Sequence, residues 1–201
     1  MLLLSSPIYL RGEDAPSKRA VLTAALGLFV ERGLGGTTIR DIARESGFSN
    51  PVLFKWFEGR DALVRSLFVR CYQPMVGALT EVVRGPGLYR TRIDRAARLL
   101  LGLMDRELVT FLFVHENMRL LWPKVRGELE GQTLASRMGE LFDGLRQERG
   151  GSAPDPRLLA SAFLGTLGQV ARSLHSGEMG GPASVQADDL HRLFLDMARP
   201  R

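Results

Sequence analysis

Residues 37–63 read TTIRDIARESGFSNPVLFKWFEGRDAL, and this stretch contains the start and end signals of two short helices. Thr38, followed three residues later by Asp41, is typical of a capping box, in which a hydroxyl and a carboxylate accept hydrogen bonds from amides that the first helical turn leaves unpaired. Gly47 permits the left-handed backbone that a tight turn between helices needs. The sequence therefore predicts a helix that begins at about Thr38 and ends before Gly47.

A second helix is predicted directly after this turn. Ser49 or Asn50 can cap it, and Pro51 suits its first turn, because a missing amide hydrogen has no consequence there. Leu53 lies ten residues after Ala43, which is the spacing at which a helix-turn-helix packs its two helices and leaves the outer face of the second one exposed. The buried face of this helix is predicted to comprise Leu53, Trp56 and Phe57.

The exposed face of the second helix carries side chains that suit DNA recognition. Asn50 can pair with adenine, Lys55 can reach guanine or a phosphate, and the apolar atoms of this face can contact a thymine methyl. The whole chain has 27 Lys and Arg against 22 Asp and Glu, a balance that favours a polyanionic partner. An ordinary helical hairpin inside a core is the alternative, but two coupled caps at this spacing argue against it.

Apolar residues outside this stretch also recur at helical spacing, and Gly and Pro divide the chain into segments of helix length. The sequence therefore predicts an all-α protein of about nine helices, with a three-helix DNA-binding unit followed by a larger helical body. Its parts are predicted as a flexible arm over 1–16, a DNA-binding domain over 17–63 and the body over 64–201. Helices outside the quoted stretch are expected at 17–32, capped by Ser17, and at 59–84, 90–102, 104–122, 124–149, 156–176 and 184–198.

The segment between residues 24 and 63 resembles the TetR (tetracycline-repressor) family of transcriptional regulators. The matching positions are Ala24, Ala25, Phe29, Gly33, Thr37, Thr38, Asp41, Ile42, Ala43, Gly47, Ser49, Leu53, Phe54, Trp56, Phe57, Arg60 and Leu63. The resemblance implies phosphate contacts for Thr37 or Thr38, for position 54 and for Arg60, and base contacts for Arg40, Asn50, Pro51 and Lys55. We therefore predict the DNA-binding residues as Thr37, Thr38, Arg40, Ser49, Asn50, Pro51, Phe54, Lys55 and Arg60.

Three of these positions depart from the usual family pattern. Phe54 stands where the family has Tyr, so a hydroxyl that would bond a phosphate is absent. Arg60 replaces Lys and keeps the charge, and Pro51 replaces a common Gly, which stiffens the start of the helix. In the arm, Arg11, Lys18 and Arg19 either add contacts to DNA or belong to a disordered segment.

The last two predicted helices suit pairing of two copies of the chain. A single helix-turn-helix reads few base pairs, so a homodimer on a palindromic, double-stranded operator is expected. In the family these helices form a four-helix dimer interface; the alternative is burial against their own subunit. The apolar stripes are Leu159, Ala162, Phe163, Thr166, Leu167, Val170 and Leu174 over 156–176, and Leu190, Leu193, Phe194 and Met197 over 184–198.

The segment 104–122 is predicted to line a ligand pocket. Its apolar residues recur at three- and four-residue steps and place His115 in the middle of the stripe, where a lone polar group would orient an apolar ligand. The alternative is a core histidine whose hydrogen bonds are satisfied within the protein. The predicted ligand-binding residues are Met104, Phe111, His115, Met118 and Trp122.

We thus expect a DNA-binding regulator, a repressor that a small, largely apolar ligand releases from its operator. The alternatives are a DNA-binding regulator without a small-molecule inducer and a helical enzyme. Catalysis is not predicted, because His115, His175 and His191 lie far apart and no nucleophile or phosphate-binding motif occurs. With Cys71 as the single cysteine and no long apolar run, we expect no disulfide, metal site, cofactor or membrane span, and a cytoplasmic location.

Overall fold

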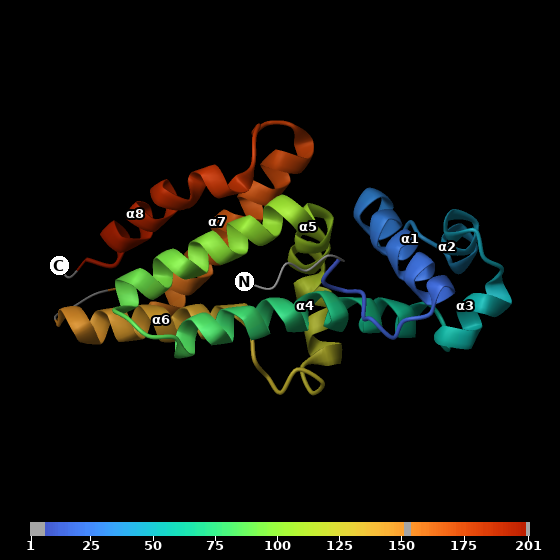
Figure 1. Cartoon of the computed structure of the whole chain (residues 1–201), viewed down its shortest axis with the longest axis horizontal. Helices are drawn as coiled ribbons and strands as arrows, with labels where there is room; N and C mark the ends of the chain where they lie inside the picture. The colour runs from blue at the N-terminus through green and yellow to red at the C-terminus, as the bar shows by residue number, and fades with distance from the viewer. Residues whose placement is uncertain (1–6, 151–153, 200–201) are drawn as a thin grey trace. The chain divides into compact units, whose positions relative to one another are not determined.

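Helices and no strands make up the regular structure of residues 7–150 and 154–199, the part of the chain that this computed structural model describes (Figure 1). The predicted all-α class is confirmed. The elements are α1 (Pro16–Arg32), α2 (Ile39–Ser46), α3 (Asn50–Trp56), α4 (Arg60–Arg84), α5 (Tyr89–Val125), α6 (Leu134–Arg149), α7 (Pro156–Ser176), the 3₁₀ helix η1 (Ala183–Gln186) and α8 (Ala187–Met197).

The chain divides into two units, and two helices contribute to both of them. The first unit comprises Met1–Pro74 and Val109–Leu129, and the second comprises Met75–Leu108 and Glu130–Arg201. The N-terminal part of α4 and the C-terminal part of α5 thus belong to the unit that contains α1, α2 and α3. Among the described residues, no helix is long and apolar enough to span a membrane.

The start and end signals of α2 are formed as the sequence predicts. The Thr38 hydroxyl accepts a hydrogen bond from the Asp41 amide at 3.2 Å, and the Asp41 carboxylate accepts one from the Thr38 amide at 3.0 Å. Gly47 ends the helix with a φ of 74°, and its amide bonds back to the carbonyls of the last turn. The capping box and the left-handed turn are both confirmed.

The helix α1 begins differently from the prediction. It starts at Pro16, the residue at its N-cap is Ala15, and no side chain caps it, so the predicted cap by Ser17 is wrong. The fixed φ of Pro16 suits a first helical turn and its missing amide hydrogen needs no acceptor, which lets the helix start one residue earlier. The Ser17 hydroxyl instead accepts a hydrogen bond from the indole of Trp56.

Two predicted helix boundaries in the middle of the chain are wrong. The expected separation of 90–102 from 104–122 lies instead at Glu107, whose non-helical backbone (φ −137°, ψ 39°) interrupts α5. The predicted helix 124–149 begins only at Leu134, because residues 126–131 form turns and Thr133 caps a new helix through the Ser136 amide. Positive φ values at Glu130 and Gly131 are incompatible with a helix through this loop.

At the C-terminal end, α7 has the predicted bounds, whereas the predicted helix 184–198 is divided into η1 and α8. In the second unit the rings of Phe142, Phe163 and Phe194 form the centre of the core, with Phe163 and Phe194 centroids 4.9 Å apart. In the first unit an aromatic core joins α1, α4 and α5 through Phe29, Phe68, Tyr72, Phe113 and Trp122.

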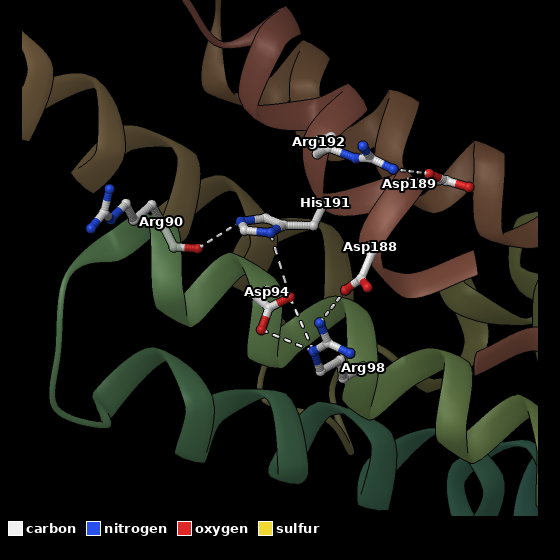
Figure 2. Close-up of polar contacts among 7 residues, drawn as sticks. All are labelled: Arg90, Asp94, Arg98, Asp188, Asp189, His191 and Arg192. Atoms are coloured by element: carbon white, nitrogen blue, oxygen red, sulfur yellow. Dashed lines mark hydrogen bonds and ion pairs between the residues drawn. The ribbon is translucent and has the colours of Figure 1, made fainter. Parts of the chain in front are cut away.

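Charged side chains tie α8 to the first half of α5 within the second unit (Figure 2). Arg98 bonds both Asp94, at 3.0 Å, and Asp188. His191 Nε2 donates to the Arg90 carbonyl at 3.1 Å, and His191 Nδ1 lies 3.5 Å from Asp94. Because most of these groups are exposed, the network contributes little to stability and mainly fixes the register of α8 on α5.

The N-terminal segment has no regular helix in its described part, residues 7–15, and it packs against the first unit. Tyr9 is buried and its hydroxyl lies 3.2 Å from the Thr23 hydroxyl of α1. Asp14 is also buried, against Arg70 of α4. The first six residues of the predicted arm lie outside the described residues.

Candidate DNA-binding interface

The short helix α3 packs one face against the protein and exposes the other to solvent. Leu53 is fully buried, and Phe57 is buried at the position that ends the helix. On the opposite face Phe54 is 54% exposed and Lys55 and Pro51 are exposed. A large apolar side chain beside an exposed cation on one helix face is suited to a partner that offers both phosphates and base methyl groups.

The first turn of α3 has a proline and no side-chain cap. Ser49 occupies the N-cap position, but its side chain accepts no hydrogen bond from the helix amides. Asn50 is half-buried and Pro51 follows it as the second helical residue. The Ser49 hydroxyl is exposed and its hydrogen-bonding capacity remains for an external partner.

The residues that precede α2 have two different environments. Thr37 is 2% exposed, and its hydroxyl donates to the carbonyls of Leu28 and Gly33 at 3.2 and 3.0 Å. Thr38 and Arg40 are exposed. Of the two threonines given phosphate contacts by resemblance, Thr38 is therefore the one whose side chain is accessible.

Arg60 joins the start of α4 to the loop before α2. Its Nε donates to the Thr37 carbonyl at 2.8 Å, and its guanidinium carbon lies 5.9 Å from the centroid of the Phe29 ring. The side chain is half-exposed, and its Nη1 lies 3.8 Å from Asp61. Nε is thus bonded within the protein, while the side chain as a whole remains 31% exposed.

Trp56 has a role in this unit that the sequence analysis missed. It was predicted to be buried, but it is half-buried, and its Nε1–H donates to the Ser17 hydroxyl at 3.2 Å. The Nζ atoms of Lys18 and Lys55 lie 5.7 and 5.1 Å from the centroid of its ring. Two cations near one indole indicate cation–π interactions, which hold Lys55 beside the end of α3.

The predicted DNA-binding residues all lie on or beside α2, α3 and the start of α4. The structure brings them into one unit, although the side chain of Thr37 is internal. The exposed members are Thr38, Arg40, Ser49, Pro51, Phe54 and Lys55, and the half-buried ones are Asn50 and Arg60.

The predicted ligand-binding residues fall on the two sides of the interruption at Glu107. Met104 is buried in the second unit, and the other four lie in the first. Phe111 is buried, whereas His115, Met118 and Trp122 are half-buried. The Trp122 ring packs edge-on against Tyr72 at 6.2 Å between centroids.

The predicted dimer stripes are partly internal to the second unit. Leu159, Phe163 and Leu167 of α7 and Leu190 and Phe194 of α8 are buried without a second copy of the chain, because they form the core with α6. Leu193 and Met197 of the stripe on α8 are exposed. Leu158 and Val185, which the stripes did not include, are exposed as well.

Comparison with known proteins relates both the sequence and the fold to one family. Residues 21–67 match the model of bacterial regulatory proteins of the tetR family. The HTH-type transcriptional activator FasR of Mycolicibacterium smegmatis (strain ATCC 700084 / mc(2)155) is 25% identical over 156 residues, which cover 78% of this chain and 68% of FasR.

Two solved structures have the same fold at low sequence identity. A bacterial regulatory protein in the tetR family from Rhodococcus RHA1 has a TM-score of 0.81 and 15% identity, covering 94% of this chain and 100% of that one. FadR from Bacillus subtilis in complex with stearoyl-CoA has a TM-score of 0.69 and 12% identity, covering 90% and 99%. The match over residues 21–67, the similarity to FasR and the shared fold support a TetR-type, DNA-binding transcriptional regulator.

Proposed function

We propose that the chain is a homodimeric repressor that binds a palindromic operator and leaves it when a small, largely apolar ligand binds, without catalysing a reaction. Residues 17–63 would read DNA, and residues 64–201 would sense the ligand and dimerise. The single observation that carries the proposal is the presentation of Phe54 and Lys55 on a helix anchored by Leu53. Because the partner is chromosomal DNA, we propose a cytoplasmic location.

For DNA contact we propose a division between phosphate-binding and base-reading side chains. Thr38 and the terminal nitrogens of Arg60 would bind phosphates at the two ends of the helix-turn-helix. Arg40, Ser49, Asn50 and Pro51 would approach base edges in the major groove. Lys55 would reach a base edge and neutralise the phosphate beside it. Phe54 would add apolar contact in place of the hydroxyl that a tyrosine would supply. Thr37 would position the loop through its buried hydroxyl and would not contact DNA.

For dimerisation we propose the exposed apolar side chains around α7 and α8. Leu158, Val185, Leu193 and Met197 are each more than two-fifths exposed, and covering such side chains is a common reason for pairing. A twofold pair would present two copies of α3 to successive major grooves, about one helical turn of DNA apart.

For the ligand we propose a molecule with a long apolar part, contacted by the predicted residues of the first unit, Phe111, His115, Met118 and Trp122. FadR from Bacillus subtilis was solved with stearoyl-CoA, which makes a long-chain acyl-CoA the first compound to test. Such a ligand would act by binding better to a conformation whose two recognition helices are wrongly spaced for the operator.

Activation is the second candidate function, and one observation favours it. FasR, the relative identified above, is named a transcriptional activator. The same DNA-binding dimer would activate or repress according to where the operator lies relative to the promoter. A reporter gene with the operator moved from downstream to upstream of the promoter distinguishes the two.

The test of the proposed function is selection of bound sequences from a random DNA library with the full-length protein. We expect enrichment of a twofold-symmetric sequence, followed by release of the labelled operator on addition of stearoyl-CoA. Enrichment of no sequence at low salt would overturn the DNA-binding proposal. Enrichment of an asymmetric single site would overturn the dimer, and an unchanged operator affinity with stearoyl-CoA would overturn that ligand.

A further inference from the structure

Within the first unit, the carboxylate of Asp14 joins the N-terminal segment, α1 and α4. Nη1 and Nη2 of Arg70, on α4, donate to it at 2.6 and 3.0 Å. The Arg11 amide of the N-terminal segment donates at 2.8 Å, and Nζ of Lys18, on α1, lies 3.2 Å away. The side chains of Asp14 and Arg70 are 2% and 7% exposed, so this is a buried charged junction.

The Asp14 carboxyl of this junction is strongly favoured in its ionised form. Burial raises the pKa of the Asp14 carboxyl, but hydrogen bonds from Arg70, from the Arg11 amide and from Lys18 outweigh it and hold that pKa well below its usual range. Nη1 of Arg70 also donates to the Tyr9 carbonyl at 3.2 Å. Removal of Asp14 would leave Arg70 buried without its counter-ion, and removal of Arg70 would leave Asp14 with Lys18 alone, which makes this contact costly to rearrange.

The junction continues to the recognition helix through α1. Lys18, which pairs with Asp14, also lies 5.7 Å from the Trp56 ring centroid. The neighbouring Ser17 accepts the Trp56 indole hydrogen. Trp56 is the last residue of α3, and Nζ of Lys55 lies 5.1 Å from the centroid of its ring. A continuous series of polar contacts therefore runs from Arg70 on α4 to the side chain that we propose reads DNA.

Arg70 also occupies a distinct position along α4. Pro74, one turn later, has no amide hydrogen to donate to the Arg70 carbonyl, so the helix lacks a backbone hydrogen bond at this turn. The first unit ends at the same residue. The junction thus holds α4 on the DNA-binding side of the point where its backbone is weakest.

We infer that Arg70, Asp14 and Lys18 are positioning residues that fix the recognition helix to α4 through Trp56. The inference rests on the proposed DNA-binding function, because its consequence is that a disturbance of α4 at Arg70 changes the orientation of α3. Buried, fully paired networks have few alternative arrangements and transmit displacement where loose apolar contacts absorb it.

The first test reads Trp56 in the full-length protein without DNA. The chain contains two tryptophans, so a nitrogen–proton correlation spectrum has two indole signals, and Trp122→Phe identifies that of Trp56. We expect Arg70→Lys, which keeps the charge but loses the two-pronged contact, and Asp14→Asn to shift the Trp56 signal. Arg98→Met, which removes an exposed ion pair in the second unit, should leave it in place.

An unshifted Trp56 signal in Arg70→Lys and Asp14→Asn proteins that are folded by circular dichroism would overturn the inference. Both variants keep a polar side chain of nearly the original size, so folded protein is expected for each of them. A merely structural salt bridge would lower the melting temperature and leave the folded-state indole signal unchanged.

The second test reads operator affinity by fluorescence anisotropy. We expect Arg70→Lys and Asp14→Asn each to lower operator affinity about fivefold. The double variant should lose no more affinity than either single variant, because both changes act on one series of contacts. Additive losses would overturn the inference. Failure of the wild-type protein to bind any selected operator would refute the proposed function instead, and the indole measurement, made without DNA, would still decide the contact series.

Discussion

The indole Nε1–H of Trp56 donates to the hydroxyl of Ser17 at 3.2 Å, so the last residue of α3 is bonded to the first turn of α1. We expect Trp56→Phe, which keeps an aromatic ring but loses this bond, to weaken operator binding about fivefold, since a hydrogen bond of this kind contributes about 1 kcal/mol.

Ser17→Ala should reproduce that loss, and the double variant should be no worse than either single one. Anisotropy titrations of the selected operator measure all three. Independent, multiplicative losses would mean that Trp56 acts on DNA by another route.

Lys55→Ala should weaken operator binding and make it less dependent on salt. A lysine that neutralises a phosphate releases a counter-ion, so its loss lowers the slope of log affinity against log salt by about 1. Lys124→Ala, which removes the same charge from an exposed residue of α5, is the matched control. Equal slopes for the wild type and Lys55→Ala would assign Lys55 to base contact or to no contact.

Gly144→Ala should destabilise the second unit. A Cβ added to Gly144 on α6 would lie 2.1 Å from Cε1 of Tyr89, so the ring must move, at a cost of about 1–3 kcal/mol in the free energy of unfolding. Gly139→Ala, on the same helix and with no atom within 4 Å of the added Cβ, should instead stabilise it by about 0.5–1 kcal/mol. Denaturant unfolding checks both, and a neutral Gly144→Ala would contradict the close approach.

Asp14→Asn should lower the free energy of unfolding at neutral pH, and should lower it by less under acid conditions. Because the pKa of Asp14 is lower in the folded state, its carboxylate stabilises the fold above the unfolded pKa, about 3.9 for Asp, and this contribution is lost as the pH falls towards the folded value. The difference in unfolding free energy between wild type and variant should therefore narrow from pH 7 to pH 3. A difference that stays constant with pH would show that Asp14 acts through packing alone.

Leu193→Glu should shift the protein from dimer to monomer. Leu193, on α8, is 50% exposed within a single subunit, and a charge there cannot be buried in an apolar interface without a large penalty. Leu120→Glu changes an equally exposed leucine on α5 and should leave the mass unchanged. Light scattering after gel filtration distinguishes the two, and a dimeric Leu193→Glu protein would place the interface elsewhere.

Local signals in the sequence predicted what depends on neighbouring residues. Thr38 with Asp41, and Gly47 after them, fix the ends of α2 through atoms only a few residues apart. The helical class and the outer face of α3 follow from spacing in the same way. These are the features for which elementary rules of capping and periodicity are sufficient.

Contacts between distant residues were beyond such rules. Ser17 and Trp56 are 39 residues apart, and Asp14 and Arg70 are 56 apart. Glu107 interrupts α5 although it is neither Gly nor Pro. Leu159, Phe163, Leu167, Leu190 and Phe194 of the apolar stripes predicted for dimerisation are buried in the core of their own unit. A periodic stripe shows that a helix face is buried and does not show against what.

The interruption at Glu107 also determines how α5 can unfold locally. A helix melts cooperatively only along an unbroken ladder of backbone hydrogen bonds, and the non-helical backbone at this residue divides that ladder. The amides of the two halves will therefore exchange with heavy water independently, each protected by the unit to which it belongs. One half of α5 can lose its helical hydrogen bonds while the other half keeps its own.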